Sequence, residues 1–247
     1  MNKIIVNNGI HKADQSPEWD KIVAALKLWR KNLTAEQKKL SPNNELNAGS
    51  PSVTTVAEHY KKDPWAVLVS TILSLRTKDE VTLKCSRALL AKAPTPAKLL
   101  ELKEETIAHL AYPAGFYRTK AKNLKKIAAL IIDNHNGKVP DDLETLLSLP
   151  GVGRKTANLV LIEAYNKDGI CVDIHVHRIS NRTGWLTSKT PEETEMILRQ
   201  ILMRKYWKVI NPLLVLYGQN ICRPVSPWCS LCVMADHCRR IGVSSSR

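Results

Sequence analysis

The segment Leu149 to Ala157, with the sequence LPGVGRKTA, constrains the fold more than any other part of the chain. Its two glycines, separated by one residue, predict a tight turn, and two cations follow directly. On both sides the apolar residues recur at helical spacing. The apolar residues are Leu143, Leu146 and Leu147 before the turn, and Ala157, Val160, Leu161 and Ala164 after it. The sequence therefore predicts a helix-hairpin-helix.

The two cations, Arg154 and Lys155, stand at the start of the second helix. The N-terminal end of a helix already carries partial positive charge, so a merely solvated basic start is slightly disfavoured. Glycines let backbone N–H groups approach a phosphate closely, and the helix end attracts the same anion. We expect the turn to bind the DNA backbone without sequence preference, and it predicts no chemistry by itself.

The rest of the chain also has helical spacing. A helix is expected from Pro17 to about Asn32, and a buried helix begins at the Asp63-Pro64 pair. Residues 33–52 are polar and rich in Asn, Ser and Pro, which indicates a linker or surface loop. Further helices are expected at 81–90, 97–102, 105–111, 120–133 and 142–148. Without an alternating strand pattern of useful length, the predicted class is all-α.

Charge and apolar runs restrict the partners. The formal net charge is +14 and the pI is near 9.6, which favours a polyanion partner, chiefly nucleic acid. The longest uncharged apolar run, Pro64 to Leu75, is far shorter than the roughly 20 residues that span a bilayer. Residues 1–20 have no continuous apolar segment before a small-residue cleavage site and contain acidic residues, a pattern that argues against a secretory or organelle signal. We therefore expect a cytoplasmic, nucleoid-associated protein with no membrane contact.

Four of the six cysteines lie near the end of the chain, in the pattern Cys-x6-Cys-x2-Cys-x5-Cys: Cys222, Cys229, Cys232 and Cys238. In a cytoplasmic chain such a cluster indicates metal ligands rather than disulfides. Zinc sites usually have two short hooks, whereas here one hook has longer arms, which favours a [4Fe-4S] cluster over zinc. Unligated surface thiols are a third alternative. Cys85 and Cys171 are expected to be core residues.

Two residues are candidates for chemistry. Lys155 lies about 200° around the helix from the buried stripe and points toward phosphate or into a cleft. A neutral lysine can form a Schiff base, and the helix N-terminus, Arg154 and partial burial would each favour the neutral amine. Asp173, eighteen residues later, lies in the basic sequence VDIHVHR and should stay ionised. It could cap a helix or stabilise an oxocarbenium-like sugar.

These three motifs together, LPGVGRKTA, VDIH and the cysteine pattern, resemble those of the endonuclease III family of DNA glycosylase/AP lyases. The resemblance covers roughly residues 60–240. It implies a six-helix barrel domain at 60–165 and a second helical domain, built from 17–59 and 166–247, that holds the [4Fe-4S] cluster. It also implies excision of oxidised pyrimidines from duplex DNA, followed by strand cleavage through β-elimination. A monomer is expected.

The resemblance also implies roles for single residues. Lys155 would attack C1′ of the flipped nucleotide, and Asp173 would assist departure of the base. Gly151, Val152 and Gly153 would bind phosphate through their amides, and Arg154 would help electrostatically.

The sequence departs from the family pattern at two positions. Arg76 stands where a glutamine commonly fills the gap left by the flipped nucleotide, and Phe116 stands where a leucine wedge is common. Both side chains can intercalate or stack.

Two other functions remain open from the sequence. A non-catalytic DNA-binding module would explain the hairpin and the charge, with the metal cluster as a structural or redox element. A monofunctional mismatch glycosylase would release a base without cutting the strand. Lys155 argues for the bifunctional class, because the mismatch and adenine glycosylases of the superfamily lack a lysine there.

Overall fold

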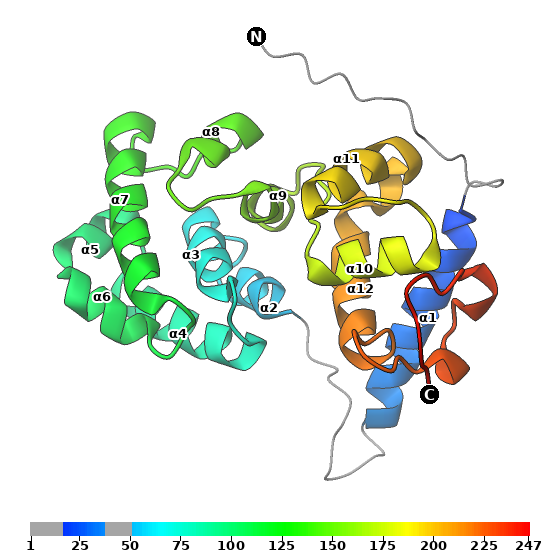
Figure 1. Ribbon diagram of the computed structural model, residues 1–247. Coiled ribbons are helices and arrows are strands. Elements are labelled where there is room, and N and C mark those ends of the chain that lie inside the picture. Colours follow the sequence, from blue (N-terminus) through cyan, green and yellow to red (C-terminus); the bar gives the residue numbers. More distant parts are fainter. Residues whose placement is uncertain (1–16, 38–50) are drawn as a thin grey trace.

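The structure, a computed structural model, describes residues 17–37 and 51–247. In these ranges every regular element is a helix, which confirms the all-α prediction (Figure 1). No helix there is long and apolar enough to cross a membrane. The α-helices are α1 (Trp19–Gln37), α2 (Ser52–His59), α3 (Pro64–Ser74), α4 (Asp79–Lys92), α5 (Pro96–Glu101), α6 (Glu104–Ala111), α7 (Tyr117–His135), α8 (Leu143–Ser148), α9 (Arg154–Glu163), α10 (Ile174–Thr183), α11 (Pro191–Ile201) and α12 (Trp207–Asn220). The short 3-10 helices are η1 (Arg204–Tyr206), η2 (Cys229–Leu231) and η3 (Ala235–His237).

Several helices begin where a side chain can satisfy a free backbone N–H group. The carboxylate of Asp63 accepts a hydrogen bond from the Ala66 N–H at 2.8 Å, and Pro64 is the first residue of α3. Asp142 accepts one from the Thr145 N–H at 2.9 Å at the start of α8. Such caps are worth about 1 kcal/mol each, so the short acidic residues fix where these helices start.

The apolar side chains form two hydrophobic clusters. The first is built from α2 to α9, and the second from α1 and the helices after α9. Figure 1 shows α1 beside α10 and α12, so the two ends of the described chain share one cluster. The consecutive residues Ile170 and Cys171 belong to different clusters, and the chain therefore crosses between them just before α10. Domain boundaries at 60 and 165 stay a prediction.

The structure corrects the prediction for the N-terminal part. Helix α1 continues to Gln37 instead of ending near Asn32, because Leu33 extends the apolar stripe of Leu26 and is only 4% exposed. The polar segment 33–52 thus begins within a helix, and most of the rest of it lies outside the described residues. Helix α2 was not predicted, although it buries apolar side chains with helical spacing, Val53, Val56 and Ala57.

Candidate active site

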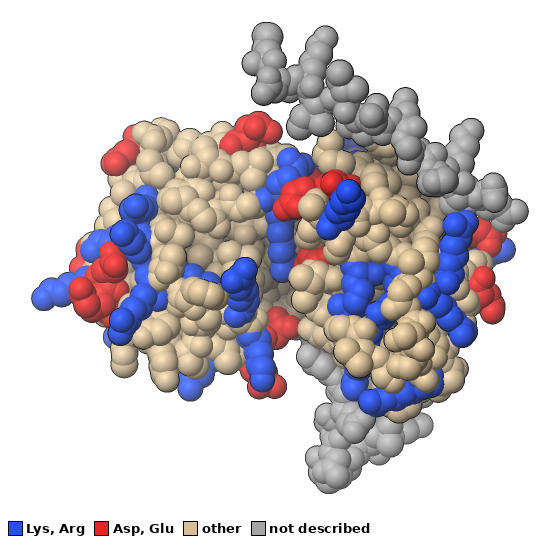
Figure 2. Space-filling view, in the orientation of Figure 1, with Lys and Arg blue, Asp and Glu red and all other residues tan. Residues whose placement is uncertain are grey.

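A cavity of about 700 Å³ lies between the two clusters. Loop residues that follow α3 line one side, α9 lines a second, and the start of α10 with part of α12 lines the third. Figure 2 shows this region as a hollow flanked by Lys and Arg side chains, with some acidic side chains at its edges. Its size is in the range of pockets that hold a ligand as large as a nucleoside.

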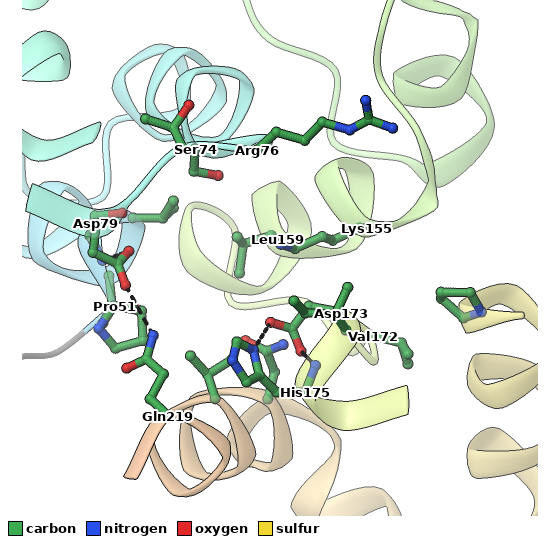
Figure 3. Close-up of a pocket in the computed structure, with 18 of the residues that line it drawn as sticks. Pro51, Ser74, Arg76, Asp79, Lys155, Leu159, Val172, Asp173, His175 and Gln219 are labelled. Atoms are coloured by element: carbon green, nitrogen blue, oxygen red, sulfur yellow. Dashed lines mark hydrogen bonds and ion pairs between the residues drawn. The ribbon is translucent and has the colours of Figure 1, made fainter. Parts of the chain in front are cut away.

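Lys155 is the second residue of α9 and lines this cavity, half-buried. Figure 3 shows its side chain on the α9 side of the cavity, between Arg76 and Asp173. The backbone carbonyl of Lys155 accepts a hydrogen bond from the Cys171 thiol at 3.8 Å. Burial raises the pKa of Cys171 to about 12, so this thiol is inert and packs in the core as predicted.

Asp173 both caps a helix and lines the same cavity. One carboxylate oxygen accepts from the N–H groups of His175 at 2.9 Å and Val176 at 3.0 Å, and the other lies 2.9 Å from Nδ1 of His175. Burial opposes ionisation of the carboxylate, which is only 8% exposed. The hydrogen bond with His175 and the charges of Lys155 and His175 outweigh burial and lower the Asp173 pKa. The carboxylate is therefore ionised and faces the amine.

The turn before α9 has the backbone that the glycine pair requires. Gly151 has φ of +77°, a left-handed conformation, and a Cβ there would lie 2.6 Å from the Asn123 side chain. Val152 is buried and anchors the turn in the first cluster. Gly153 is exposed and caps α9, and a Cβ there would meet nothing within 4 Å.

Arg154 is held by another side chain. Its guanidinium donates two hydrogen bonds to Glu195 of α11, at 2.9 and 2.8 Å. Arg199 and the amide of Asn158 also donate to the Glu195 carboxylate. Burial would raise the Glu195 pKa, but its hydrogen bonds with Arg154 and Arg199 and their charges lower it. The network thus joins α9 to α11 across the two clusters.

Arg76 and Phe116 come from different parts of the chain and meet. The Arg76 guanidinium carbon lies 5.5 Å from the centre of the Phe116 ring, a cation–π contact. Both residues have left-handed backbone, with φ of 52° and 56°, and Phe116 is 62% exposed. Left-handed backbone is strained for bulky residues and is concentrated at functional sites.

The four cysteines at 222, 229, 232 and 238 lie close enough to influence one another. Burial is the largest cause that raises the pKa of the Cys238 thiol, and the charges of the other three cysteines raise this pKa further. Hydrogen-bond donors also face the sulfurs. The Tyr217 hydroxyl lies 3.1 Å from Sγ of Cys232, and an Arg182 nitrogen lies 3.5 Å from Sγ of Cys222.

The four thiols suit one kind of metal centre better than another. Among the described His, Cys, Asp and Glu side chains, no three are arranged to hold a metal ion. A single tetrahedral zinc requires its thiolates to converge at about 2.3 Å from one atom, whereas a [4Fe-4S] cluster binds each of four thiolates through a different iron. In number, chemical type and mutual proximity the thiols fit the larger group, and a cation would relieve their repulsion as thiolates.

Sequence reasoning missed three polar residues in this region: Lys120, Glu195 and Tyr217. Each is less than 7% exposed. The sequence does contain a signal for the burial of Lys120. This residue lies on the apolar stripe of α7, four residues before Leu124 and seven before Ile127. Glu195 and Tyr217 find their partners across the fold, and no local pattern reveals such contacts.

Comparisons with known proteins agree with the sequence resemblance. Residues 69–204 match a family described as HhH-GPD superfamily base excision DNA repair protein. The chain is 46% identical over 180 residues to Endonuclease III of Thermotoga maritima, covering 73% of this chain and 84% of that protein. It is 34% identical over 201 residues to Endonuclease III of Escherichia coli, covering 81% and 94%. A solved structure of a trapped endonuclease III–DNA covalent intermediate superposes with a TM-score of 0.70 at 29% identity, covering 91% of this chain and 97% of that one.

The buried Glu195 network generates a prediction about stability. Glu195→Gln should lower the free energy of unfolding at neutral pH by about 2 kcal/mol, because two arginines lose a buried carboxylate. The pKa of Glu195 is lower in the folded protein than in the unfolded chain. The ionised carboxylate therefore contributes its full share to the free energy of unfolding above the unfolded-state pKa, and this contribution is lost as the pH falls toward the folded-state pKa. The difference from wild type should therefore narrow below about pH 4.5 in urea titrations.

The matched control for this prediction is Glu101→Gln, which removes an exposed pair with Lys98. That variant should unfold like wild type, because exposed ion pairs contribute little. Equal stability of Glu195→Gln and wild type at pH 7 would contradict a joining role for the network.

Proposed function

The chain belongs to the endonuclease III family, within the HhH-GPD superfamily of base excision DNA repair proteins, and on this premise we propose that it removes oxidised pyrimidines from duplex DNA and then cuts the strand. The enzyme class, DNA glycosylase/AP lyase, follows from the family. The substrate range and the mechanism belong to the proposal. One observation carries it: Lys155 and Asp173, from two different helices, line a single cavity.

Lys155 is the proposed nucleophile. Its Nζ lone pair attacks C1′ of a nucleotide turned out of the duplex, and the bond from C1′ to the base breaks. The base departs with the bonding electrons and takes up a proton. The C1′–O4′ bond then breaks and O4′ takes up a second proton, so that the amine, which has lost two protons in all, becomes an imine with the opened sugar. Loss of a proton from C2′ then breaks the C3′–O bond and releases the downstream strand with its 5′-phosphate, and hydrolysis of the imine restores the amine.

Asp173 is proposed to lower the barrier to departure of the base. As the bond to the base lengthens, positive charge develops on the sugar, and an ionised carboxylate beside it is stabilising. The contacts that keep Asp173 ionised are within the protein, from His175 and from the start of α10, so they are in place before DNA binds. The Lys155 amine also gains a nearby counter-charge when it is protonated.

The turn at 151–153 is proposed to bind phosphate through backbone N–H groups. Neither a positive φ nor a neighbouring atom requires glycine at position 153, where a Cβ would stand in open space. The close approach of a DNA phosphate would explain a glycine at position 153, because a side chain there would stand in its way. The N-terminus of α9 attracts an anion to the same point. Arg154 is expected to support this site through the position of α9, because its guanidinium is bound to Glu195.

Arg76 and Phe116 are proposed to enter the duplex where the damaged nucleotide leaves it. Their contact places a cation and an aromatic ring together at an exposed point of the surface. Both can stack on bases, and inserted side chains offset the cost of unstacking. Arg76 and Phe116 stand where glutamine and leucine are common in the family. Any preference for the base opposite the lesion would therefore arise at these two residues.

We propose that Cys222, Cys229, Cys232 and Cys238 hold a [4Fe-4S] cluster, with zinc as the alternative. When bound, the cluster would cross-link residues 222–238 and fix the loop that they form, which Arg239 and Arg240 follow directly. Arg182 also holds the start of this loop, through hydrogen bonds to the carbonyls of Arg223 and Pro224. The protein is further proposed to act as a monomer in the cytoplasm, on the nucleoid.

The proposed chemistry predicts a covalent adduct. Borohydride should trap the chain on duplex DNA that carries an abasic site or thymine glycol, because it reduces the imine formed by Lys155. Lys155→Ala should give no adduct, while Lys167→Ala, which removes an exposed lysine paired with Asp141, should give the wild-type amount. The yield is read on denaturing gels.

Each other outcome of this experiment has a distinct meaning. Undiminished trapping by Lys155→Ala would assign the nucleophile to another residue. Release of thymine glycol without strand cleavage or adduct would support the monofunctional glycosylase. A purified chain that only binds damaged DNA, without multiple turnover, would support the non-catalytic module.

The metal assignment predicts a brown protein with broad absorbance near about 400 nm and about four iron atoms per chain. Cys232→Ser should lose the colour and most of the iron, since one of four ligands is gone. Cys85→Ala, which changes a buried core thiol away from the group, should keep both. A colourless wild-type protein with one zinc per chain would refute the cluster.

A further inference from the structure

Lys120 is a buried cation that the proposed mechanism does not use. It lies in the first turn of α7 and is 6% exposed. Its ammonium donates three hydrogen bonds to the end of α3 and the segment that follows it: to the Leu73 carbonyl at 2.8 Å, the Leu75 carbonyl at 2.6 Å and the Thr77 hydroxyl at 2.9 Å. Because burial of a charge is costly unless it is fully paired, the three contacts account for its place in the core.

The Thr77 hydroxyl extends this contact to a second segment. It accepts from the Gly115 N–H at 3.1 Å as well as from Lys120, and it donates to the Leu75 carbonyl at 3.2 Å. A hydroxyl has one donor and two acceptor positions, so every hydrogen-bonding position of Thr77 is used. The segment after α3 is thereby joined to the segment before α7.

Gly115 permits the close approach of these two segments. A Cβ at this position would lie 2.4 Å from the carbonyl oxygen of Arg76, closer than any real contact. Arg76 follows Leu75 and precedes Thr77, and Phe116 follows Gly115. The left-handed backbone of both Arg76 and Phe116 is thus enclosed by the same hydrogen-bonded unit, which we call the clasp and define as Lys120, Thr77 and Gly115.

We propose that the clasp positions Arg76 and Phe116 as one rigid wedge, so that the pair enters duplex DNA together. The inference rests on the proposed function, because it takes these two side chains to be the ones that enter the duplex. Lys120 and Gly115 do not line the cavity, and the Thr77 hydroxyl, at its edge, has every hydrogen-bonding position taken by the protein, so all three are positioning residues. Holding the strained backbone before DNA arrives removes an ordering cost that would otherwise oppose insertion.

The clasp predicts a selective effect on duplex DNA. A single-stranded abasic oligonucleotide offers Lys155 the same aldehyde but has no stacked partner strand to open. Thr77→Val and Lys120→Met should therefore lower the rate of borohydride trapping on an abasic duplex by about tenfold. The rate on the abasic single strand should change less than about twofold.

Three further variants separate positioning from general stability. Thr77→Ser keeps the hydroxyl and should restore the duplex rate of wild type. Lys125→Met removes a lysine of the same helix that donates to the Leu102 carbonyl at 2.8 Å, away from the clasp, and should leave the ratio of duplex to single-strand rates unchanged. Gly115→Ala should lower that ratio, because its methyl group displaces Arg76. Thermal unfolding of each variant shows whether it folds. If Lys120→Met does not fold, Thr77→Val tests the inference in its place.

The clasp also gives the ratio a pH dependence. Burial lowers the pKa of Lys120 to about 8. Among the described groups its titratable neighbour is the Cys85 thiol of α4, and burial raises the pKa of that thiol. Above the pKa of Lys120 the neutral amine has two N–H donors for three acceptors. The wild-type ratio of duplex to single-strand rates should therefore fall between about pH 7 and about pH 9, and stay flat in Lys120→Met.

The outcomes distinguish this inference from the proposed function. Equal losses on duplex and single strand, or no loss in Thr77→Val, would overturn the clasp while leaving Lys155 as the nucleophile. A wild-type ratio that does not change with pH would also overturn it. Absence of trapping by wild type on either substrate would instead contradict the proposed function.

Discussion

The Asp173 carboxylate is the interaction on which the rest of the site depends. It lies where the chain has just passed from one hydrophobic cluster to the other, and it starts α10 by accepting two backbone N–H groups. Burial opposes ionisation of this carboxylate, but the side-chain hydrogen bond with His175 and the charges of Lys155 and His175 lower its pKa, and the Val176 N–H at the helix start adds a smaller effect. One buried charge thus fixes the direction of α10 and faces Lys155 across the cavity (Figure 3).

The two clusters are joined by polar side chains around this cavity, and each junction positions a different part of the site. The Glu195 network fixes α9, from which Lys155 projects, relative to α11. Asp79 accepts from the Ser52 N–H at 3.1 Å and from the Gln219 side chain at 3.4 Å, and so joins the α2 side to α12. Within the first cluster, the clasp fixes Arg76 beside Phe116. Preorganisation of this kind is what a site needs when its donors and charges must be in place before substrate binds.

Local sequence patterns predicted the helical class, the start of α3 at Pro64, the start of α8 to within one residue (142 predicted, Leu143 observed) and the turn at 151–153, because each depends on residues close together in the chain. Lys155 and Asp173 could be singled out for the same reason, and the cavity now brings them together. The long-range polar contacts could not be predicted. The residues around Glu195 are those of an ordinary exposed helix. Its burial against Arg154 depends on how the first hydrophobic cluster packs against the second. The contact of Arg76 with Phe116 likewise requires the close approach at Gly115.

The most direct test of the double role of Asp173 is the substitution Asp173→Asn, because asparagine caps helices as well as aspartate does but carries no charge. We predict that the thermal unfolding midpoint stays near that of wild type. The rate of base release from thymine-glycol duplex, measured in a single turnover, should fall by about 100-fold or more. Base release at the wild-type rate by a folded Asp173→Asn protein would contradict the proposal that this carboxylate stabilises the developing charge.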